Sequence, residues 1–288
     1  MTGILNILKP TGMTSHDVVS AVRKILNIKK AGHAGTLDPN AAGVLVVCTG
    51  KATKFSEYLM SGQKEYVCEL ILGKSTDTQD SYGIVVNESD KDVALDELNE
   101  ALKKFTGEQI QIPPAYSAVK LNGRKLYEYA RQNISVEKPG RTIRIEDIKL
   151  LKFKDRSALL KVRCSKGTYI RTLCSDIGKS LGTYGHMGIL IRTESKGLHI
   201  KNSVTLDRLK FLSDSKRLNE CLIPVEDIYK LDKLNIDSKY YDRLVSGNEV
   251  DLGISIKNDE FYVYCRDSLI GTGKKTDKTK VKIDKMLI

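Results

Sequence analysis

The sequence contains no tryptophan and only four histidines, and it has no run of about 18 apolar residues that could cross a membrane as a helix. Its opening residues, Met1 to Asn6, lack the basic stretch and the long apolar core of a signal peptide. The six cysteines are scattered, and none forms a C-x-x-C pair. This spacing argues against a disulfide framework or a zinc site and for reduced, buried thiols. We therefore expect a cytosolic (cytoplasmic) protein that holds no metal.

Positive charge is in excess. Lys and Arg number 47 against 36 Asp and Glu, which gives a formal net charge of +11. Such an excess favours a polyanionic partner, because each phosphate that a cation neutralises releases counterions. An ordinary soluble basic protein has the same composition, so charge alone leaves both interpretations open. The 13 tyrosines offer aromatic surface for stacking on bases.

Hydrophobic spacing predicts a mixed α/β chain without a regular βαβ repeat. At 288 residues the chain is long enough for one large domain and a small one. We expect strands over residues 3–8, 44–49, 64–72, 84–86, 141–145, 148–153 and 158–164. We expect helices over about residues 14–26, 51–60, 95–105 and 205–212, and one that ends near residue 181. Thr14 or Ser15 should cap the first helix, and Gly107 should close the third.

The composition changes from about residue 231 to short β-like pieces. These pieces cover residues 248–252, 261–265, 269–273 and 281–283. Short strands separated by turns predict a small β-barrel appended to the main domain. We therefore expect a main domain over residues 1–230 and a small domain over residues 231–288.

Residues 112–141 differ in character from the rest of the main domain. They open with Pro113-Pro114 and crowd cations and aromatics together: Tyr116, Lys120, Arg124, Lys125, Tyr127, Tyr129, Arg131 and Lys138. The segment can be a solvated insertion between strands. It can also be an arm that contacts RNA, because cations follow phosphates and tyrosines stack on bases.

A glycine-rich loop carries a single carboxylate. Residues 32–43 read Gly-His-Ala-Gly-Thr-Leu-Asp-Pro-Asn-Ala-Ala-Gly, so Asp38 stands between glycines that can turn sharply and a proline that fixes φ. A buried strand follows at once. An aspartate before a proline is most often a turn residue, whereas a carboxylate beside a core strand can also be a chemical group. The loop alone leaves both interpretations open.

Three further side chains suit chemistry near Asp38. Tyr66 opens a strand, while Tyr169 and Arg171 occupy a strand-to-helix turn and share one face if that turn is extended. An arginine stabilises the charged form of a nearby carboxylate. A tyrosine stacks on flat bases and offers a phenolic oxygen for proton transfer. One carboxylate, one arginine and tyrosines suit chemistry on a ring held away from water.

The Asp38 loop is one of six short motifs. They read Lys-Pro-Thr-Gly at 9–12, Gly-His-Ala-Gly-Thr-Leu-Asp-Pro at 32–39, Lys-Glu-Tyr at 64–66, Thr-Asp-Thr-Gln-Asp at 76–80, Tyr-Ser-Ala-Val-Lys at 116–120 and Gly-Thr-Tyr-Ile-Arg-Thr at 167–172. In this order, across about residues 3–200, the chain closely resembles the bacterial tRNA pseudouridine-55 synthases, the TruB family. One such motif is a weak signal, whereas six in order are highly specific.

The resemblance implies a fold and a reaction. The fold is the pseudouridine synthase fold, with a central mixed, largely antiparallel sheet flanked by helices. The reaction converts a uridine in the T-loop of tRNA to pseudouridine without a cofactor. The uracil is released, rotates and rejoins the ribose through C5 in a closed pocket, so the nucleotide must leave its stack. The implied partner is the T-arm of tRNA, with no obligate protein partner and a monomer as the default.

The resemblance also implies roles for particular residues. Asp38 matches the catalytic aspartate, which attacks the nucleotide or otherwise assists cleavage of its glycosidic bond. Tyr66 matches the tyrosine that stacks on the target base, and Arg171 matches the arginine that pairs with the carboxylate. The other matched positions are implied to bind substrate: His33, which helps hold the flipped-out nucleotide, Tyr169 and Leu190 as pocket walls, and Asp80 beside the target.

Two positions depart from the family pattern. Ala42 stands where Thr or Ser is common in the family. Ile191 stands where the family usually has a second arginine, and this departure puts one phosphate or loop contact in doubt but not the chemistry. The C-terminal segment resembles a PUA domain, an RNA-binding barrel, through Leu-Val-Ser-Gly at 244–247 and Ile-Gly-Thr-Gly at 270–273. We expect the motif at Lys9 to support the Asp38 loop rather than to take part in the chemistry.

Two other functions are compatible with a basic RNA-binding surface. A non-catalytic RNA-binding protein or tRNA chaperone would use the same basic surface and would not need Asp38. A methyltransferase of the tRNA T-arm would need a methyl-donor site and, for uracil C5, a thiolate nucleophile. The sequence shows no glycine-rich donor loop and no cysteine in a motif that resembles an active site. The sequence therefore favours the tRNA uridine isomerase.

Overall fold

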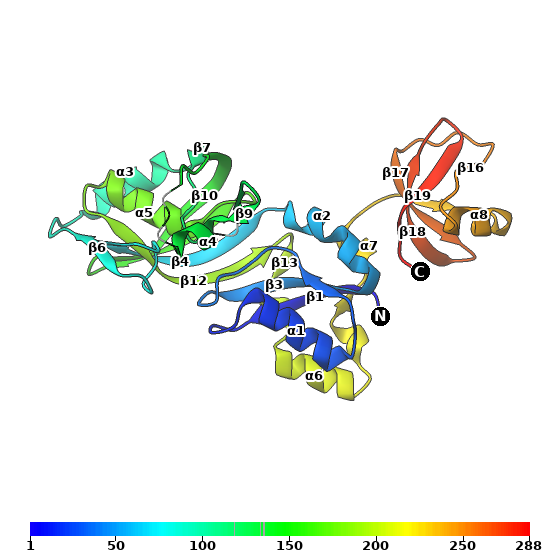
Figure 1. Cartoon of the computed structure of the whole chain (residues 1–288), viewed down its shortest axis with the longest axis horizontal. Helices are drawn as coiled ribbons and strands as arrows, with labels where there is room; N and C mark the ends of the chain where they lie inside the picture. Colours follow the sequence, from blue (N-terminus) through cyan, green and yellow to red (C-terminus); the bar gives the residue numbers. More distant parts are fainter. Residues whose placement is uncertain (118, 133, 135) are drawn as a thin grey trace.

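A ten-stranded sheet is the central element of the larger part of the molecule (Figure 1). The computed structural model describes residues 1–117, 119–132, 134 and 136–288. The main path of the sheet runs β14-β1-β3-β12-β4-β11-β10-β7, with β2 on β3 and β13 on β12. Its strands are β1 (Gly3–Lys9), β2 (Ala31–His33), β3 (Ala42–Thr49), β4 (Lys64–Leu72), β7 (Gly107–Gln111), β10 (Arg141–Lys154), β11 (Ser157–Cys164), β12 (Gly185–Ser195), β13 (Leu198–His199) and β14 (Leu222–Ile223).

The sheet is mixed, because β12 pairs with β3 in parallel while its other strand pairs are antiparallel. The strict alternation of β4 puts Tyr66, Cys68, Leu70 and Leu72 on one buried face. The helices α3 (Leu95–Lys104) and α5 (Ile170–Ser180) cover that face and share its apolar core. This arrangement confirms the predicted mixed, largely antiparallel sheet flanked by helices.

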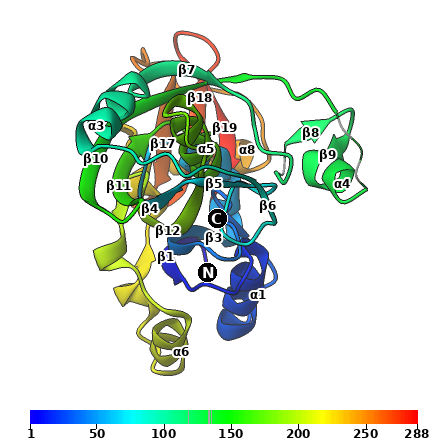
Figure 2. The same ribbon diagram turned by 90° about the vertical axis from the view of Figure 1, so that its left-hand side faces the viewer.

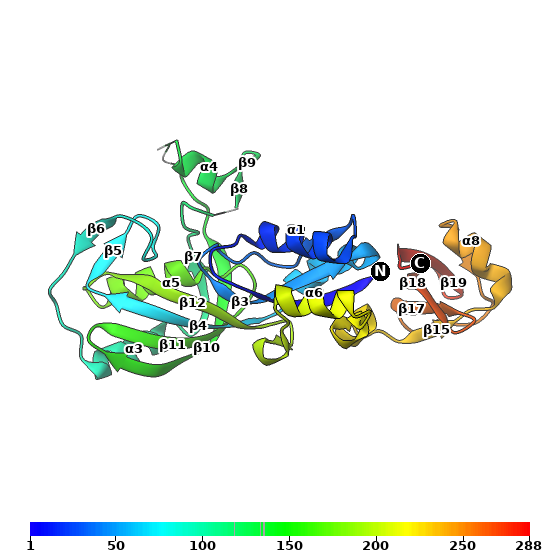
Figure 3. The same cartoon turned by 90° about the horizontal axis from the view of Figure 1, so that it is seen from below.

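A second pair of helices covers the other end of the sheet. The helices α1 (Ser15–Leu26) and α6 (Leu206–Asp214) lie side by side and pack on β1 and β3 (Figure 3). Thr14 caps α1 as predicted, since its hydroxyl accepts the N–H of Asp17 while the Asp17 carboxylate accepts the N–H of Thr14. The short helices η1 (Gly50–Phe55) and α2 (Ser56–Met60) lie over a third apolar cluster.

Three boundary predictions were wrong. The helix α3 ends at Lys104 with Phe105 as its C-cap, and Gly107, expected as the cap, instead opens β7 with a φ of +107°. The single helix expected over residues 51–60 is a 3₁₀ helix followed by one α-helical turn. The two strands expected between residues 141 and 153 form one long strand, β10, with register shifts that bend it. Local turn residues do not reveal whether a neighbouring strand continues to pair.

The described residues between 112 and 140 stand away from the sheet as an arm, while Arg141 already belongs to β10 (Figures 2 and 3). The described part of the arm holds a two-stranded hairpin, β8 (Lys120–Leu121) and β9 (Arg124–Lys125), and the short helix α4 (Leu126–Ala130). Cations lie over its aromatic rings: Arg124 is 4.9 Å from the ring centre of Tyr129, and Arg131 is 5.4 Å from that of Tyr127. These contacts keep cations and rings together at the surface.

A second, five-stranded sheet follows residue 232 and has its own core. Its order is β15-β17-β18-β19-β16, built from β15 (Lys233–Asn235), β16 (Val250–Asp251), β17 (Glu260–Cys265), β18 (Ser268–Lys275) and β19 (Lys280–Met286), with α8 (Tyr241–Val245) beside it. The helix α7 (Val225–Ile228) precedes it. The separate sheet fits the small barrel expected there, while the exact boundary at residue 231 stays a prediction.

Two remaining features complete the fold. The strands β5 (Lys74–Thr76) and β6 (Val85–Glu88) form a separate hairpin at the far end of the large sheet (Figure 1). Among the described residues, no helix combines the length and the apolar character that crossing a membrane requires.

Gly178 in α5 tests how closely the helix approaches the sheet. A Cβ at this position would lie 2.3 Å from the backbone nitrogen of Gly185, where β12 begins. Gly→Ala in an open helix stabilises by roughly 0.5–1 kcal/mol, but here we expect Gly178→Ala to lower the free energy of unfolding by about 2 kcal/mol through overpacking. Urea denaturation measures the change, with Lys179→Ala on the exposed side as the control. An unchanged or higher midpoint for Gly178→Ala would contradict this packing.

Candidate active site

One cavity of about 990 Å³ brings the sequence-predicted site residues together. It lies where the loop between β2 and β3, the strands β4 and β12, the turn before β6 and the start of α5 meet the arm. All seven predicted side chains line it: His33, Asp38, Tyr66, Asp80, Tyr169, Arg171 and Leu190. Its size lies at the upper end of the usual range for ligand sites, so it can take a whole nucleotide.

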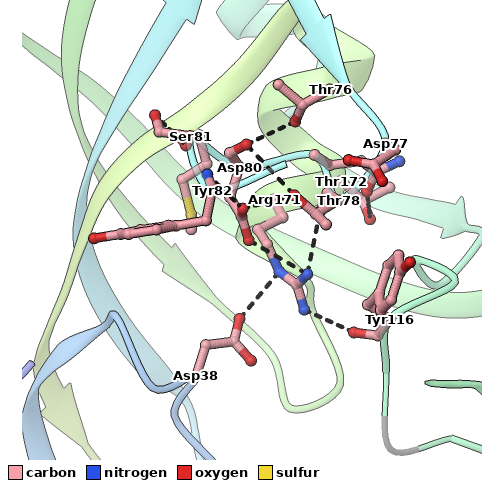
Figure 4. A network of polar contacts seen from close by, with 12 residues as sticks. Asp38, Thr76, Asp77, Thr78, Asp80, Ser81, Tyr82, Tyr116, Arg171 and Thr172 are labelled. Atoms are coloured by element: carbon pink, nitrogen blue, oxygen red, sulfur yellow. Dashed lines mark hydrogen bonds and ion pairs between the residues drawn. The ribbon is translucent and has the colours of Figure 1, made fainter. Parts of the chain in front are cut away.

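The guanidinium of Arg171 is the centre of the site (Figure 4). Its Nε lies 3.0 Å from Oδ2 of Asp38, and its Nη1 lies 3.6 Å from Oδ2 of Asp80. It also donates to the carbonyl oxygens of Thr78 at 3.1 Å and Tyr116 at 3.0 Å. The Arg171 side chain is 7% exposed, so these acceptors are needed to compensate for the lost hydration of its charge.

Asp38 is far more open than its partner. Its side chain is 42% exposed and faces the cavity, and Arg171 is its one ion-pair partner among the described residues. A carboxylate held at one oxygen by a buried cation keeps a fixed orientation while its other oxygen can reach a ligand. This geometry suits a group that acts on a substrate rather than one that only caps a turn.

Asp80 has a different environment from Asp38. Its side chain is 16% exposed, and its Oδ1 accepts from the hydroxyl of Thr78 at 2.7 Å and from the N–H of Tyr82 at 3.1 Å. The carboxylate therefore orders its own turn and faces Arg171. The contact to RNA beside the target, expected for Asp80 from the sequence, stays a prediction.

Arg192, on β12, holds the Asp38 loop through backbone carbonyls. It is 1% exposed and donates to three backbone carbonyls, those of Val44 at 2.7 Å, Gly35 at 3.1 Å and Thr36 at 3.3 Å. Sequence reasoning missed this role, because it looked for the second arginine at position 191. The sequence signal that could have found it is an arginine within the apolar run of residues 187–192, which predicts a strand that buries it.

The residue at position 191 makes a different contact. Ile191 is the register partner of Ala42 across the parallel pair β12–β3. The two departures from the family pattern thus face each other, one on each strand. Arg192, the next residue, contacts the Asp38 loop, whereas the effect of Ile191 on a phosphate or loop contact stays a prediction.

Lys9 holds the same loop through three other backbone carbonyls. The fully buried ammonium donates to the carbonyls of Ala41 at 2.6 Å, Pro10 at 2.9 Å and Pro39 at 3.0 Å. Burial lowers the pKa of Lys9 to about 8, although the nearby Asp38 carboxylate favours its charged form. These bonds agree with the supporting role expected for its motif.

Tyr66 forms a buried wall of the cavity. It lies on β4 beside Arg192, its register partner on β12, and is 7% exposed. Burial raises the pKa of the Tyr66 phenol, an effect that the Arg192 cation partly offsets. The phenol is therefore neutral at physiological pH and can donate a hydrogen bond or a proton.

His33 and Tyr169 are positioned by different means. Burial lowers the pKa of His33, and the Arg192 cation lowers it further, so the ring is neutral near pH 7. The buried Nδ1 of His33 has no hydrogen-bond partner among the described residues. Tyr169 is held by Gln111, whose amide accepts the Tyr169 N–H at 2.8 Å and donates to its carbonyl at 3.1 Å. Gln111, on the distant β7, carries no sequence signal that would have marked it.

Comparison with known proteins decides the family. A family model described as TruB family pseudouridylate synthase (N terminal domain) matches residues 23–170. The chain belongs to the TruB family. A second model, described as tRNA pseudouridylate synthase B C-terminal domain, matches residues 171–230.

Relatives resemble this TruB chain along its whole length. The tRNA pseudouridine synthase B of Alkaliphilus oremlandii is 44% identical over 280 residues, which cover 95% of this chain and 93% of the relative. That of Clostridioides difficile is also 44% identical, over 306 aligned residues that cover 100% of both chains.

Solved structures confirm the TruB fold class. The chain matches a Cbf5-Nop10-Gar1 complex with a TM-score of 0.73 and 30% identity, over 99% of this chain and 85% of the other. It matches an H/ACA RNP bound to a substrate RNA containing 2'-deoxyuridine with a TM-score of 0.70 and 28% identity, again over 99% and 85%. The match includes the C-terminal sheet, which fits a PUA-like domain.

The three carbonyls around Lys9 predict a pH dependence. Above its pKa of about 8 the neutral amine has only two N–H groups, so one carbonyl loses its donor and the Asp38 loop loosens. We expect the single-turnover rate on the substrate proposed below to fall on the alkaline side with an apparent pKa near 8. In Lys9→Met the rate should be low throughout and this alkaline step absent.

Lys64 provides the matched control for Lys9. Burial also lowers the pKa of Lys64 to about 8, but its ammonium donates to just two carbonyls, those of Met60 and Gly62. The neutral amine of Lys64 can keep both bonds, so its deprotonation should not change the rate. The alkaline step should therefore remain in Lys64→Met. Loss of the step in Lys64→Met, or its persistence in Lys9→Met, would contradict the assignment to Lys9.

Proposed function

We propose that this TruB chain isomerises the uridine at position 55 in the T-loop of tRNA to pseudouridine. The observation that carries the proposal is the Asp38 carboxylate, paired with the buried Arg171 and open to a nucleotide-sized cavity. Membership of a pseudouridylate synthase family and relatives named tRNA pseudouridine synthase B support the reaction and its substrate.

The reaction balances without a cofactor. The bond from uracil N1 to the ribose C1′ breaks, the freed uracil rotates, and a new bond forms from C5 to C1′. The proton on C5 leaves to water, and N1 gains a proton. Asp38 is proposed to attack the nucleotide or otherwise assist cleavage, while Arg171 holds the carboxylate in a fixed orientation.

The cavity walls are proposed to hold the free uracil while it turns. Tyr66 stacks on the base, and its neutral phenol is the candidate for the late proton transfer. Tyr169 and Leu190 complete the walls. Neutral His33 helps keep the nucleotide out of its stack, since unstacking must be compensated by contacts in the pocket.

The substrate is proposed to bind across the arm and the C-terminal barrel. The arm brings Lys125, Tyr127 and Arg131 to the cavity, where cations meet phosphates and an aromatic ring meets bases. The residues from 231 onward are proposed to act as a PUA-like RNA-binding domain of a monomer that needs no obligate protein partner. A place in the cytoplasm is part of the same proposal.

The methyltransferase alternative is weakened by the cysteines. All six thiols are buried, and none lies among the described residues that line the cavity. Burial raises the pKa of Cys48 and of Cys164 to about 12, so these thiols are not nucleophiles near pH 7. The remaining alternative is an RNA-binding protein or tRNA chaperone that does not use Asp38.

Removal of the Asp38 charge separates the isomerase from that alternative. With T-arm RNA carrying tritium at uridine C5 and nothing else added, the unaltered protein should release tritium to water. Asp38→Asn and Asp38→Ala should lose at least about 10³-fold of the rate, because no other group replaces the carboxylate. Their affinity for the RNA, measured by filter binding, should change little, because the charge acts mainly on the reaction.

Two outcomes would reject the isomerase. One is the absence of tritium release by the unaltered protein, and the other is undiminished release by Asp38→Asn. Pro39→Ala serves as the control for a change in the same loop that leaves the carboxylate in place. It should keep most of the rate if folding of the loop is unaffected.

The cations of the arm predict that binding depends on salt. Each phosphate contact contributes close to one unit to the slope of log affinity against log salt. We expect affinity for the T-arm to fall steeply between 50 and about 200 mM salt. Replacement of both Lys125 and Arg131 by Gln should reduce the slope by about two. The same change at Lys210, within α6, and Lys216, just after it, should leave the slope unchanged, because neither residue lines the cavity. An affinity for T-arm RNA that does not change with salt concentration would show that the arm is not part of the binding surface.

A further inference from the structure

Tyr82 is an aromatic residue at the edge of the cavity to which the proposed reaction gives no role. It lines the cavity, yet 69% of its surface is exposed, more than for any other aromatic residue that the structure describes. In Figure 4 its ring projects away from the Asp38–Arg171 pair. The ring therefore offers a large apolar face to whatever enters the cavity.

The turn that carries Tyr82 is well held. The N–H of Tyr82 donates to Oδ1 of Asp80 at 3.1 Å, and the N–H of Ser81 donates to the carbonyl of Met187 on β12 at 3.0 Å. On its far side, the N–H of Ile84 donates to Oδ1 of Asp77 at 2.8 Å. A ring on a fixed backbone loses little conformational entropy when a partner stacks on it.

The surface continues to be apolar beyond the ring. Ile84 is 76% exposed, and Val86, two residues further along β6, is 55% exposed. Several exposed apolar side chains within five residues of an exposed cavity-lining ring are consistent with a binding surface. The partner that fits it presents flat or apolar groups to this side.

Charge decides which part of an RNA can meet this surface. The turn that carries Tyr82 also carries the carboxylates Asp77 and Asp80, whereas the arm brings Lys125 and Arg131 to the same cavity. Phosphates are drawn to the cations of the arm and repelled by the carboxylates of the turn. An RNA in the cavity therefore turns its bases, not its backbone, toward Tyr82.

We propose that Tyr82 is a stacking platform for an unpaired nucleobase that adjoins the target nucleotide. The inference rests on the proposed function, because the target base fills the cavity and its neighbour in the RNA must lie at the mouth. Tyr82 binds substrate and takes no part in bond breaking. Every base has a flat face, so the platform adds affinity without selecting one base.

The first test separates stacking from chemistry. Tyr82→Ala should weaken binding of T-arm RNA about tenfold, while Tyr82→Phe should bind as the unaltered protein does. The single-turnover rate at saturating RNA should stay within about twofold in both. Phe211→Ala, at an aromatic residue on α6 that is 49% exposed and outside the cavity lining, is the matched control and should not change affinity.

The second test locates the base. T-arm RNAs carry 2-aminopurine at each position that adjoins the target, one at a time. The unaltered protein and Tyr82→Phe should change the fluorescence at one of these positions, and Tyr82→Ala should not. An abasic site at that position should weaken binding about tenfold for the unaltered protein but change little for Tyr82→Ala, since the partner of the lost base is already absent.

The outcomes distinguish the platform from the reaction. The platform is overturned if Tyr82→Ala binds the RNA as tightly as the unaltered protein does. It is also overturned if Tyr82→Ala causes the same loss of affinity for the abasic RNA as for the intact RNA. An equal loss of affinity in Tyr82→Phe overturns it as well. Each of these results leaves the isomerase standing if tritium release by the unaltered protein is intact. Absence of tritium release overturns the isomerase, and the fluorescence and binding measurements then decide the platform by themselves.

Discussion

The burial of one cation, the guanidinium of Arg171, constrains the whole site. A buried charge is tolerated when acceptors surround it, and here they come from three separate parts of the chain: the carboxylates of Asp38 and Asp80 and the carbonyl of Tyr116 at the base of the arm. The need to satisfy this group draws the loop, the turn and the arm to the first turn of α5. The site is thus a consequence of desolvation as much as of chemistry.

The loop of Asp38 is held through its backbone, which leaves the Asp38 side chain open to the cavity. Lys9 and Arg192 together donate to six carbonyls around it, and the hydroxyl of Ser15 exchanges hydrogen bonds with the backbone of Leu37. These contacts use no part of the Asp38 carboxylate. Rigid backbone around a free acidic oxygen is the arrangement that a preorganised site requires.

Much of the fold and most of the candidate site could be predicted locally. The alternation of β4 and the cap at Thr14 follow from spacing and from side-chain hydrogen bonds within a few residues. Arg192 and Gln111 could not be placed in this way, because their partners lie 148 and 58 residues away along the chain. The sequence indicated that Gly43 lets the loop turn sharply, but a Cβ there would also lie 2.2 Å from the carbonyl oxygen of Arg192, so Gly43 also allows β3 and β12 to pack closely.

Short motifs in the sequence were enough to predict the family and the mixed fold and to name Asp38 as the candidate acidic group, because motifs record which chemical groups are present. The spatial arrangement of these groups could not be read from the motifs and became visible in the folded chain. The folded chain shows that Asp38 meets Arg171, that Arg192 holds the loop, and that Tyr82 stands free at the cavity mouth. The reason is physical, since burial, charge compensation and exposure depend on residues far apart in the chain.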